Sequence, residues 1–162
     1  MSTGTRTAVV GVDGTPQSTA ALEWALRFAA ESGWRLRCVT AYDVQQVTVP
    51  AMPMTVTPFE DPAVAQEQAE LTLASAVFRA RHEVPEATGV PLTEEVVPGR
   101  PGQVLVDLSA EADLLVLGSH GHSRLFEAVL GSTSGWCVRH AHCPVVVLPP
   151  RSEHLEQHRA GR

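Results

Sequence analysis

The sequence predicts a single α/β domain with an open, mostly parallel, doubly wound sheet of five strands. Short apolar runs alternate with amphipathic segments of helical period along the chain. Most of the short runs are continuously apolar, as in a parallel sheet covered on both faces. The chain has 162 residues, 44% of them hydrophobic, which suits one such domain. We place the domain at residues 1–150 and a polar, disordered tail at 151–162.

The first half of the chain contains two strands, two helices and one irregular segment. Residues 7–13 and 34–43 read as buried strands. Between them, Pro16 and Gly33 bound a helix whose apolar residues recur at helical spacing: Ala21, Leu22, Ala25, Leu26 and Ala29. Prolines punctuate residues 44–61, which we expect to form a variable loop. An amphipathic helix follows at 62–82, and its expected apolar face is Val64, Leu71, Ala74, Val77 and Phe78.

The second half continues the alternation and places polar residues at strand ends. Strands are predicted at 92–97, 113–118 and 144–148. Helices are predicted from Pro101, with Val104, Leu105 and Leu108 inward, and at 132–141. Right-handed crossovers then give a Rossmann-like sheet, in which ligands bind outside the carboxyl ends of the strands. Asp13 and Gly118 both fall at such ends.

Composition excludes several classes of protein. The formal net charge is −6 and no basic cluster stands out, which argues against binding to nucleic acid. No apolar run is long enough to cross a membrane, and the first residues lack the apolar core of a signal peptide. The three cysteines form no C-x-x-C pair and no disulfide framework. We therefore expect a cytoplasmic protein.

The segment GSHGHSRLFEAVLGSTS, residues 118–134, contains the main functional motif. Its glycines are spaced as Gly118-x2-Gly121-x9-Gly131-Ser132, with Thr133 and Ser134 opening the next helix. Free N–H groups at a helix N-terminus suit phosphate oxygens, and glycines let the backbone approach the anion. Ser132 either caps the helix or donates to phosphate. The chain has no lysine and no P-loop, and GSTSG has threonine where a hydrolase would have its serine nucleophile.

This glycine spacing resembles the ATP-binding members of the universal stress protein family. The resemblance extends to VVGVDGTPQSTAALEWAL near the start, to VVPGRPGQVLVDLSAEADLLVLGSHGHSR in the middle and to HCPVVVLP at the end. It implies ATP as the ligand, with Mg or Mn on the phosphates. It also implies the binding residues, by position: Gly11, Val12, Asp13, Ala41, Pro98, Gly99, Gly118, Gly121, Gly131, Ser132, Thr133 and Ser134. Of these, Asp13 would meet ribose or adenine, the backbone of Ala41 would read the adenine edge, and Pro98 and Gly99 would close the adenine side.

The resemblance further implies a homodimer joined through strand 144–148. An apolar strand at a sheet edge independently favours some cover, either a second copy or the polar tail. The implied role is a nucleotide-dependent regulator or sensor in stress adaptation, and at most a slow ATPase. The alternatives are a homodimeric, chaperone-like scaffold with an unused pocket, and a weak phosphohydrolase or phosphotransferase that uses His120 or His122.

Several motifs have simpler interpretations. Asp13 precedes Gly14, and Asp-Gly is a turn signal by itself. The segment CVRHAHC, residues 137–143, resembles a zinc site, but it crosses from a helix end to a strand start, and we expect no metal there. Its Cys143 fits a small buried hydrophobe. The three tryptophans are expected in the core or in an interface rather than under a base.

Overall fold

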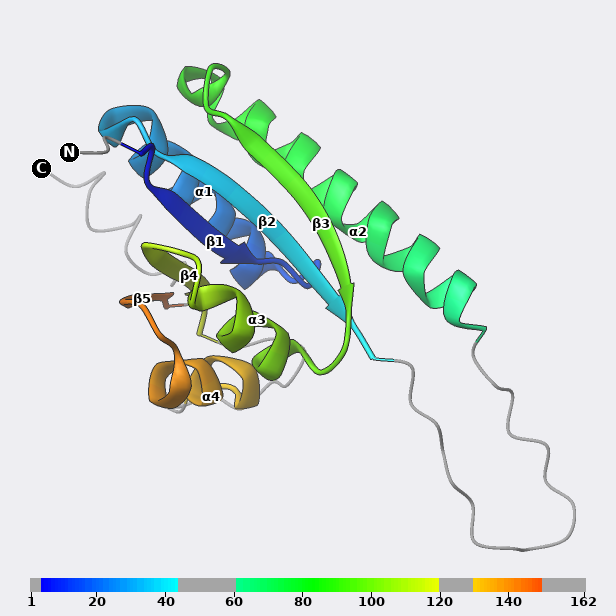
Figure 1. The fold of residues 1–162 in the computed structure, drawn as a ribbon. Helices are drawn as coiled ribbons and strands as arrows, with labels where there is room; N and C mark the ends of the chain where they lie inside the picture. Colours follow the sequence, from blue (N-terminus) through cyan, green and yellow to red (C-terminus); the bar gives the residue numbers. More distant parts are fainter. Residues whose placement is uncertain (1–3, 44–60, 120–129, 150–162) are drawn as a thin grey trace, which may run out of the picture.

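The computed structural model describes residues 4–43, 61–119 and 130–149, which form one parallel sheet with helices on both faces (Figure 1). The strands are β1 Thr7–Gly11, β2 Arg35–Tyr42, β3 Leu92–Pro98, β4 Leu114–Gly118 and β5 Val145–Leu148. The helices are α1 Pro16–Ser32, α2 Pro62–Glu83, the 3-10 turn η1 Pro85–Ala87, α3 Pro101–Ser109 and α4 Ser132–His140. The predicted fold class is confirmed.

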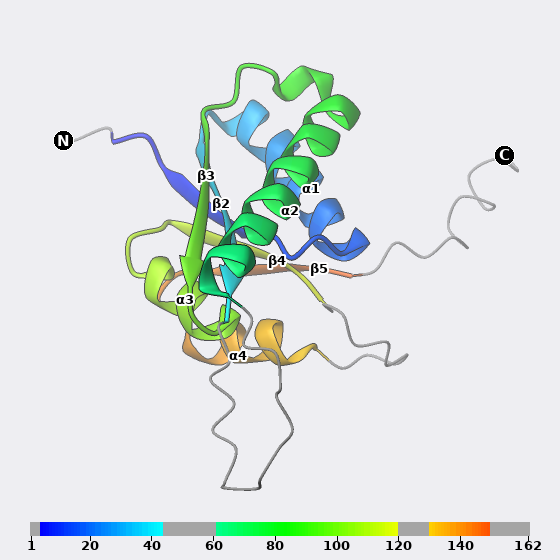
Figure 2. The same cartoon turned by 90° about the vertical axis from the view of Figure 1, so that its right-hand side faces the viewer.

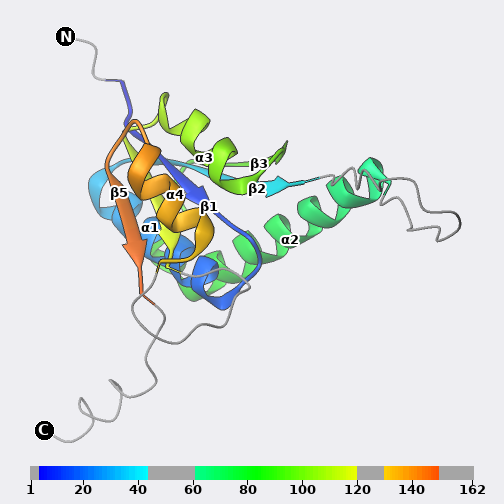
Figure 3. The same cartoon turned by 90° about the horizontal axis from the view of Figure 1, so that it is seen from below.

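The sheet has the strand order β3-β2-β1-β4-β5, with every pair parallel. The chain moves outward from β1 through β2 to β3, then returns to the other side of β1 for β4 and β5. Strand order therefore reverses between β1 and β4, and the carboxyl ends of these strands form the point where such sheets bind ligands. β5 lies at one edge of the sheet, beside α4, and α2 lies toward the other edge (Figure 3).

The helices divide the core into two layers. α1 and α2 cover one face of the sheet, and α3 and α4 cover the other (Figure 2). Leu22, Leu26 and Leu73 pack on the first face against the β1 and β2 side chains. Leu105 and Cys137 pack on the second face against alternate residues of the same strands. Both faces are apolar, which explains the continuously apolar strands.

α1 has the boundaries and the buried face that the sequence predicts. The Thr15 side chain accepts a hydrogen bond from the Ser18 N–H, and Pro16 opens the helix. Gly33 ends it in the left-handed conformation, with φ 72°. The predicted apolar face, Ala21 to Ala29, is fully buried.

The predicted apolar face of α2 is wrong. Val64, Leu71 and Phe78 are 46%, 62% and 74% exposed, and Ala74 is exposed as well, so Val77 alone of the five is buried. The buried face consists mainly of small side chains: Ala69, Leu73, Ala76, Val77 and Ala80. α2 packs against α1, β2 and β3 together, and the alanines allow that close approach.

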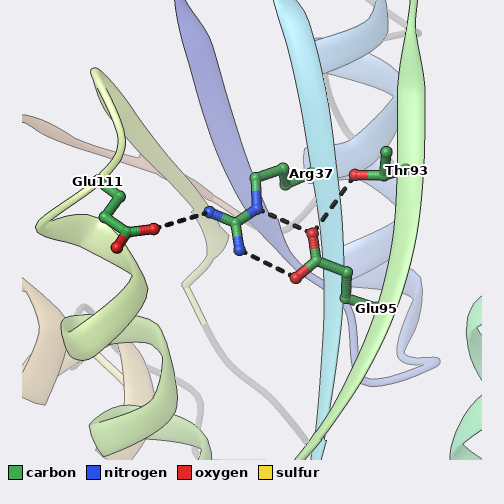
Figure 4. Close-up of polar contacts among 4 residues, drawn as sticks. All are labelled: Arg37, Thr93, Glu95 and Glu111. Carbon is green, nitrogen blue, oxygen red and sulfur yellow. Dashed lines mark hydrogen bonds and ion pairs between the residues drawn. The ribbon is translucent and has the colours of Figure 1, made fainter.

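A polar cluster joins β2, β3 and the segment after α3 (Figure 4). The Arg37 guanidinium donates to both carboxylate oxygens of Glu95, at 2.8 and 2.9 Å, and lies 3.9 Å from Glu111. Thr93 donates to Glu95 at 3.4 Å. The hydrogen bonds raise the pKa of Arg37 and lower that of Glu95. The cluster therefore fastens the outer strand β3 to β2 through a bidentate pair.

Some predictions fall outside the described residues. Among these are the loop 44–61, except for Asp61, and the tail 151–162. Asp61 caps α2, because its carboxylate accepts a hydrogen bond from the Ala63 N–H at 2.9 Å. Among the helices of the described part, none has the length and apolarity needed to cross a membrane.

Candidate functional site: a cavity at the carboxyl ends of the strands

A cavity of about 530 Å³ opens where β1, β2 and β4 end. This volume lies within the usual range for small-molecule sites. Its walls are formed by the β1–α1 turn, the ends of β2 and β4, the N-terminal half of α2, α3 and the N-terminus of α4. Of the predicted site residues, the cavity brings together Gly11, Val12, Asp13, Ala41, Gly118, Gly131, Ser132, Thr133 and Ser134.

Asp13 caps its own turn and also lines the cavity. Its Oδ1 accepts hydrogen bonds from the Thr15 backbone N–H at 3.0 Å and from the Thr15 hydroxyl at 2.5 Å. The turn interpretation of the Asp-Gly pair is therefore confirmed, and Gly14 has φ 80°. The residue is exposed, and its other carboxylate oxygen makes no hydrogen bond within the described part of the chain. One aspartate thus fixes the turn and still presents an acceptor to a ligand.

Close packing explains why two positions of the site are glycine. A Cβ on Gly118 would lie 2.9 Å from the Gln17 carbonyl carbon, in the first turn of α1. A Cβ on Gly11 would lie 2.6 Å from the Leu117 Cδ2. These glycines let β1, β4 and α1 converge at the floor of the cavity.

The N-terminus of α4 supplies unpaired backbone donors. Gly131 is the N-cap residue, and within the described part of the chain no side chain caps the first amides. In the described part of the chain, no backbone acceptor is paired with the N–H groups of Ser132, Thr133 and Ser134. The Ser134 hydroxyl donates to the Ser119 carbonyl at 2.8 Å and is buried. That bond fixes the helix start against the end of β4.

The end of β2 presents backbone groups to the cavity. The register of β1 with β2 ends at Gly11 opposite Val39, and one further bond joins the Val12 N–H to the Val39 carbonyl at 2.8 Å. Ala41 lies two residues beyond Val39, so its backbone groups point to the same side of β2 as those of Val39. At that position β1 has already ended. Pro98 and Gly99 do not line the cavity, and the Gly99 N–H donates to the Tyr42 carbonyl instead. Gly121, His120 and His122 lie outside the described residues.

Sequence reasoning missed the α2 wall of the cavity. Ala65, Gln68, Ala69 and Thr72 line it from the first three turns of the helix. The sequence motifs lie at strand ends and glycines, whereas α2 carries none of them. A weak signal was present, because Gln68 and Thr72 are four residues apart and so share a helix face. Ser18, Val39, Thr40, Tyr42, Pro101, Leu105 and Leu117 complete the lining.

The described lining has one charged side chain, the Asp13 carboxylate, and no cationic one. An anion at α4 would therefore be held by backbone dipoles rather than by side-chain charge. No group of three histidine, cysteine or acidic residues suited to a metal occurs in the described ranges 4–43, 61–119 and 130–149. In the zinc-like segment, Cys137 is buried in the α3–α4 layer, while His140 stacks on Trp136 at 3.9 Å between ring centroids. Burial raises the pKa of the Cys137 thiol to about 11.

Comparisons with known proteins agree with the fold. The sequence profile described as "Universal stress protein family" matches residues 4–149. Universal stress protein Rv2005c of Mycobacterium tuberculosis is 36% identical over 140 residues, covering 86% of this chain and 44% of that protein. Universal stress protein Rv1996 of the same species is 33% identical, covering 87% and 47%. The chain thus spans less than half the length of these relatives.

Solved structures show the same architecture. UspA from Lactobacillus plantarum superposes with a TM-score of 0.65 at 24% identity, covering 91% of this chain and 99% of that one. A universal stress protein solved in complex with cAMP gives 0.65 at 29% identity, covering 91% and 98%. The Archaeoglobus fulgidus protein solved with dAMP gives 0.60 at 21% identity, covering 89% and 97%. From the profile match and the mycobacterial relatives, the chain belongs to the universal stress protein family.

Proposed function

We propose that this protein binds an adenine nucleotide in the cavity at the strand ends and acts as a nucleotide-dependent regulator in stress adaptation. ATP, with Mg or Mn on its phosphates, is the expected ligand. The observation that carries the proposal is the open N-terminus of α4, whose first amides face the cavity behind an uncapped Gly131. Amides with no protein acceptor, at the positive end of a helix, are suited to phosphate oxygens.

The composition of the lining fits a nucleotide rather than a compact inorganic anion. Phosphate would occupy the α4 end, and the free oxygen of Asp13 would accept from a ribose hydroxyl. The apolar side chains of Val12, Val39 and Leu105 offer a surface for a base. A single carboxylate is too few for an all-protein cation site, so a divalent ion would keep water ligands and be held mainly by the phosphates.

The solved relatives support an adenine nucleotide. Proteins of the same fold were solved with cAMP, with AMP and with dAMP. All three ligands contain adenine and one phosphate group, and they differ in the hydroxyls and the phosphate ester of the ribose. A longer phosphate chain that extends past the α4 amides would let the same site hold ATP.

Isothermal titration calorimetry of nucleotide-free protein with AMP and with Mg·ATP tests the proposal. The protein is first checked for co-purified nucleotide by its absorbance ratio. We expect saturable binding to one site per chain. An absence of heat with either ligand at millimolar concentration would refute nucleotide binding and favour a scaffold with an unused pocket.

Gly131→Val provides the matched variant. Gly131 has φ −59° and ψ 166°, a conformation that valine adopts without strain, so the fold should persist. The added side chain stands at the entrance to the α4 amides and should weaken ATP binding at least tenfold. Unchanged affinity in a folded Gly131→Val protein would exclude this role for Gly131.

The proposal includes a homodimer that pairs through β5. This strand lies at the sheet edge, and all four of its side chains are half-buried in the isolated chain. A second copy would cover the open edge and its apolar residues. A cytoplasmic location belongs to the same proposal and is supported by three free cysteines.

A further inference from the structure

We propose that Gln68 of α2 determines the base specificity of the cavity by hydrogen bonding to the edge of the adenine ring. This inference rests on the proposed nucleotide site and adds to it a residue from a helix that contributes none of the motif. Three features of the cavity carry it: its length, the anchoring of α2 beside β2, and the pairing of its polar side chains.

The cavity is long enough to separate phosphate from base. Its lining runs from β2 across β1 to β4, which are adjacent strands. Neighbouring strands are about 4.8 Å apart, so the two ends of the cavity are separated by about 10 Å. A phosphate on the α4 amides, beside the end of β4, therefore directs the base toward the end of β2.

α2 is held against this β2 end. Tyr42, the last residue of β2, donates from its hydroxyl to the Gln66 amide oxygen at 3.4 Å. Gln66 in turn donates to Glu70 at 2.9 Å. On the neighbouring helix face, a Cβ on Gly14 would lie 2.8 Å from the Thr72 methyl group, so the β1–α1 turn packs closely against α2. Gln68 lies between Gln66 and Thr72 along the helix axis, on the same face as Thr72, and lines the cavity.

Most polar side chains of the lining already have partners. The Ser18 hydroxyl donates to the Thr15 carbonyl at 3.0 Å, and the Thr40 hydroxyl donates to the Val12 carbonyl at 2.8 Å. On α2, by contrast, the Gln68 amide makes no hydrogen bond to any described residue. It is exposed, so its donor and its acceptor are both available to a ligand. Gln68 is also the only amide side chain among the described residues of the lining.

The chemistry of an amide suits adenine. A glutamine side chain accepts a hydrogen bond from the adenine N6 amino group and donates one to the adjacent ring nitrogen N1, on the Watson–Crick edge of the base. A carboxylate at the same place only accepts hydrogen bonds. It would lose the ring-nitrogen bond to adenine, but it would gain two donors from guanine, the N1–H and the N2 amino group. Gln68→Glu should therefore shift the preference from adenine toward guanine.

The test measures dissociation constants of the full chain for AMP, GMP and ribose 5-phosphate, a probe that lacks a base. We expect Gln68→Glu to lower the ratio of GMP to AMP dissociation constants roughly tenfold, which is within the range for one bidentate base contact. Gln68→Met removes the amide without adding charge and should weaken AMP binding several-fold. Methionine makes no hydrogen bond to the base. Because ribose 5-phosphate has no base, it should bind this variant as it binds the wild type.

Ser75→Glu is the matched control, since it adds the same charge to the same helix at an exposed position outside the cavity lining. It should leave the ratio of GMP to AMP dissociation constants unchanged. The inference is overturned if both Gln68 variants keep the wild-type ratio, or if Ser75→Glu shifts it equally. Wild-type protein that binds neither AMP nor ribose 5-phosphate would instead refute the nucleotide site itself.

Discussion

The two edges of the sheet are built differently. β3 has seven residues, all in register with β2 from Leu36 to Tyr42, and its exposed surface carries Thr93 and Glu94. β5 has four residues, all valine or leucine and all half-buried. Charged and polar side chains on an edge strand prevent further pairing, whereas an apolar edge invites it.

This difference indicates which edge is complete within the chain. At the β3 edge, α2 packs on one face and the Arg37–Glu95 pair lies on the other. At the β5 edge, α4 supplies a shorter cover, and Trp136 and Val138 on that helix are 40% and 49% exposed. The β5 edge is thus the side where a second chain would bury apolar surface, and four experiments probe the contrast.

The largest effect on stability is expected from Val146→Pro in β5. The Leu115 N–H donates to the Pro144 carbonyl and the Ser119 N–H donates to the Leu148 carbonyl, so even-numbered residues of β5 turn their backbone groups toward β4. Proline at position 146 removes an N–H from this ladder. Urea denaturation followed by circular dichroism should show a loss of about 2 kcal/mol or more in the free energy of unfolding.

Val147→Pro should disrupt pairing through the β5 edge without disrupting the fold. The N–H of Val147 points away from β4, so proline here spares the β4–β5 ladder and should change stability by about 1 kcal/mol or less. It removes a donor that pairing between two β5 strands would use. Sedimentation velocity should show a dimer for the wild type and a monomer for this variant. A dimeric Val147→Pro protein would place the interface elsewhere.

A smaller effect is expected at the β3 edge from Glu95→Gln. Arg37 lowers the pKa of the Glu95 carboxyl in the folded state, so the pair stabilises the fold above the ordinary glutamate pKa of about 4.3. This contribution disappears as the pH falls through the lowered pKa of the folded state. At pH 7 the variant should lose about 1 kcal/mol, and the difference from wild type should vanish in acid. A difference that is independent of pH would contradict the ion pair.

Thiol labelling compares the reactivity of the cysteines in the interior with that of the cysteine beside the β5 edge. We expect the labelling to leave the stability of the fold unchanged. Burial raises the pKa of Cys38, on β2, to about 12, and that of Cys137 to about 11. Cys143, just before β5, is half-buried, and burial and the Asp113 carboxylate raise its pKa less. At pH 8, Ellman's reagent should therefore modify one thiol in the native protein and three in denaturant. Cys143→Ser should abolish the native reaction.

The sequence predicts the fold and the glycine side of the site, because both depend on local signals. The limits of α1 follow from Thr15, Pro16 and Gly33, whose capping chemistry is local. Gly118 and Gly131 follow from their spacing and from their position at a strand end and a helix start. These signals need no knowledge of how distant segments pack.

The buried face of α2 and the position of Gln68 depend on contacts between distant segments. Periodicity on α2 favours its larger apolar residues, yet α1 and the sheet leave room mainly for alanines, so Leu71 and Phe78 lie outside. Gln68 likewise reaches the cavity only because α2 is placed beside Tyr42 and the turn at Gly14. Neither placement is visible in the spacing of residues along one helix.

The position of Trp136 has a practical consequence for measurements in solution. Its indole packs beside Gly102 at the start of α3, one turn beyond the α4 amides, and stacks on His140. Trp24 and Trp34 instead pack against the core with Phe28. Acrylamide should therefore quench the emission of Trp136 before that of the other two, so this protein contains an intrinsic fluorophore within one helical turn of its candidate phosphate site.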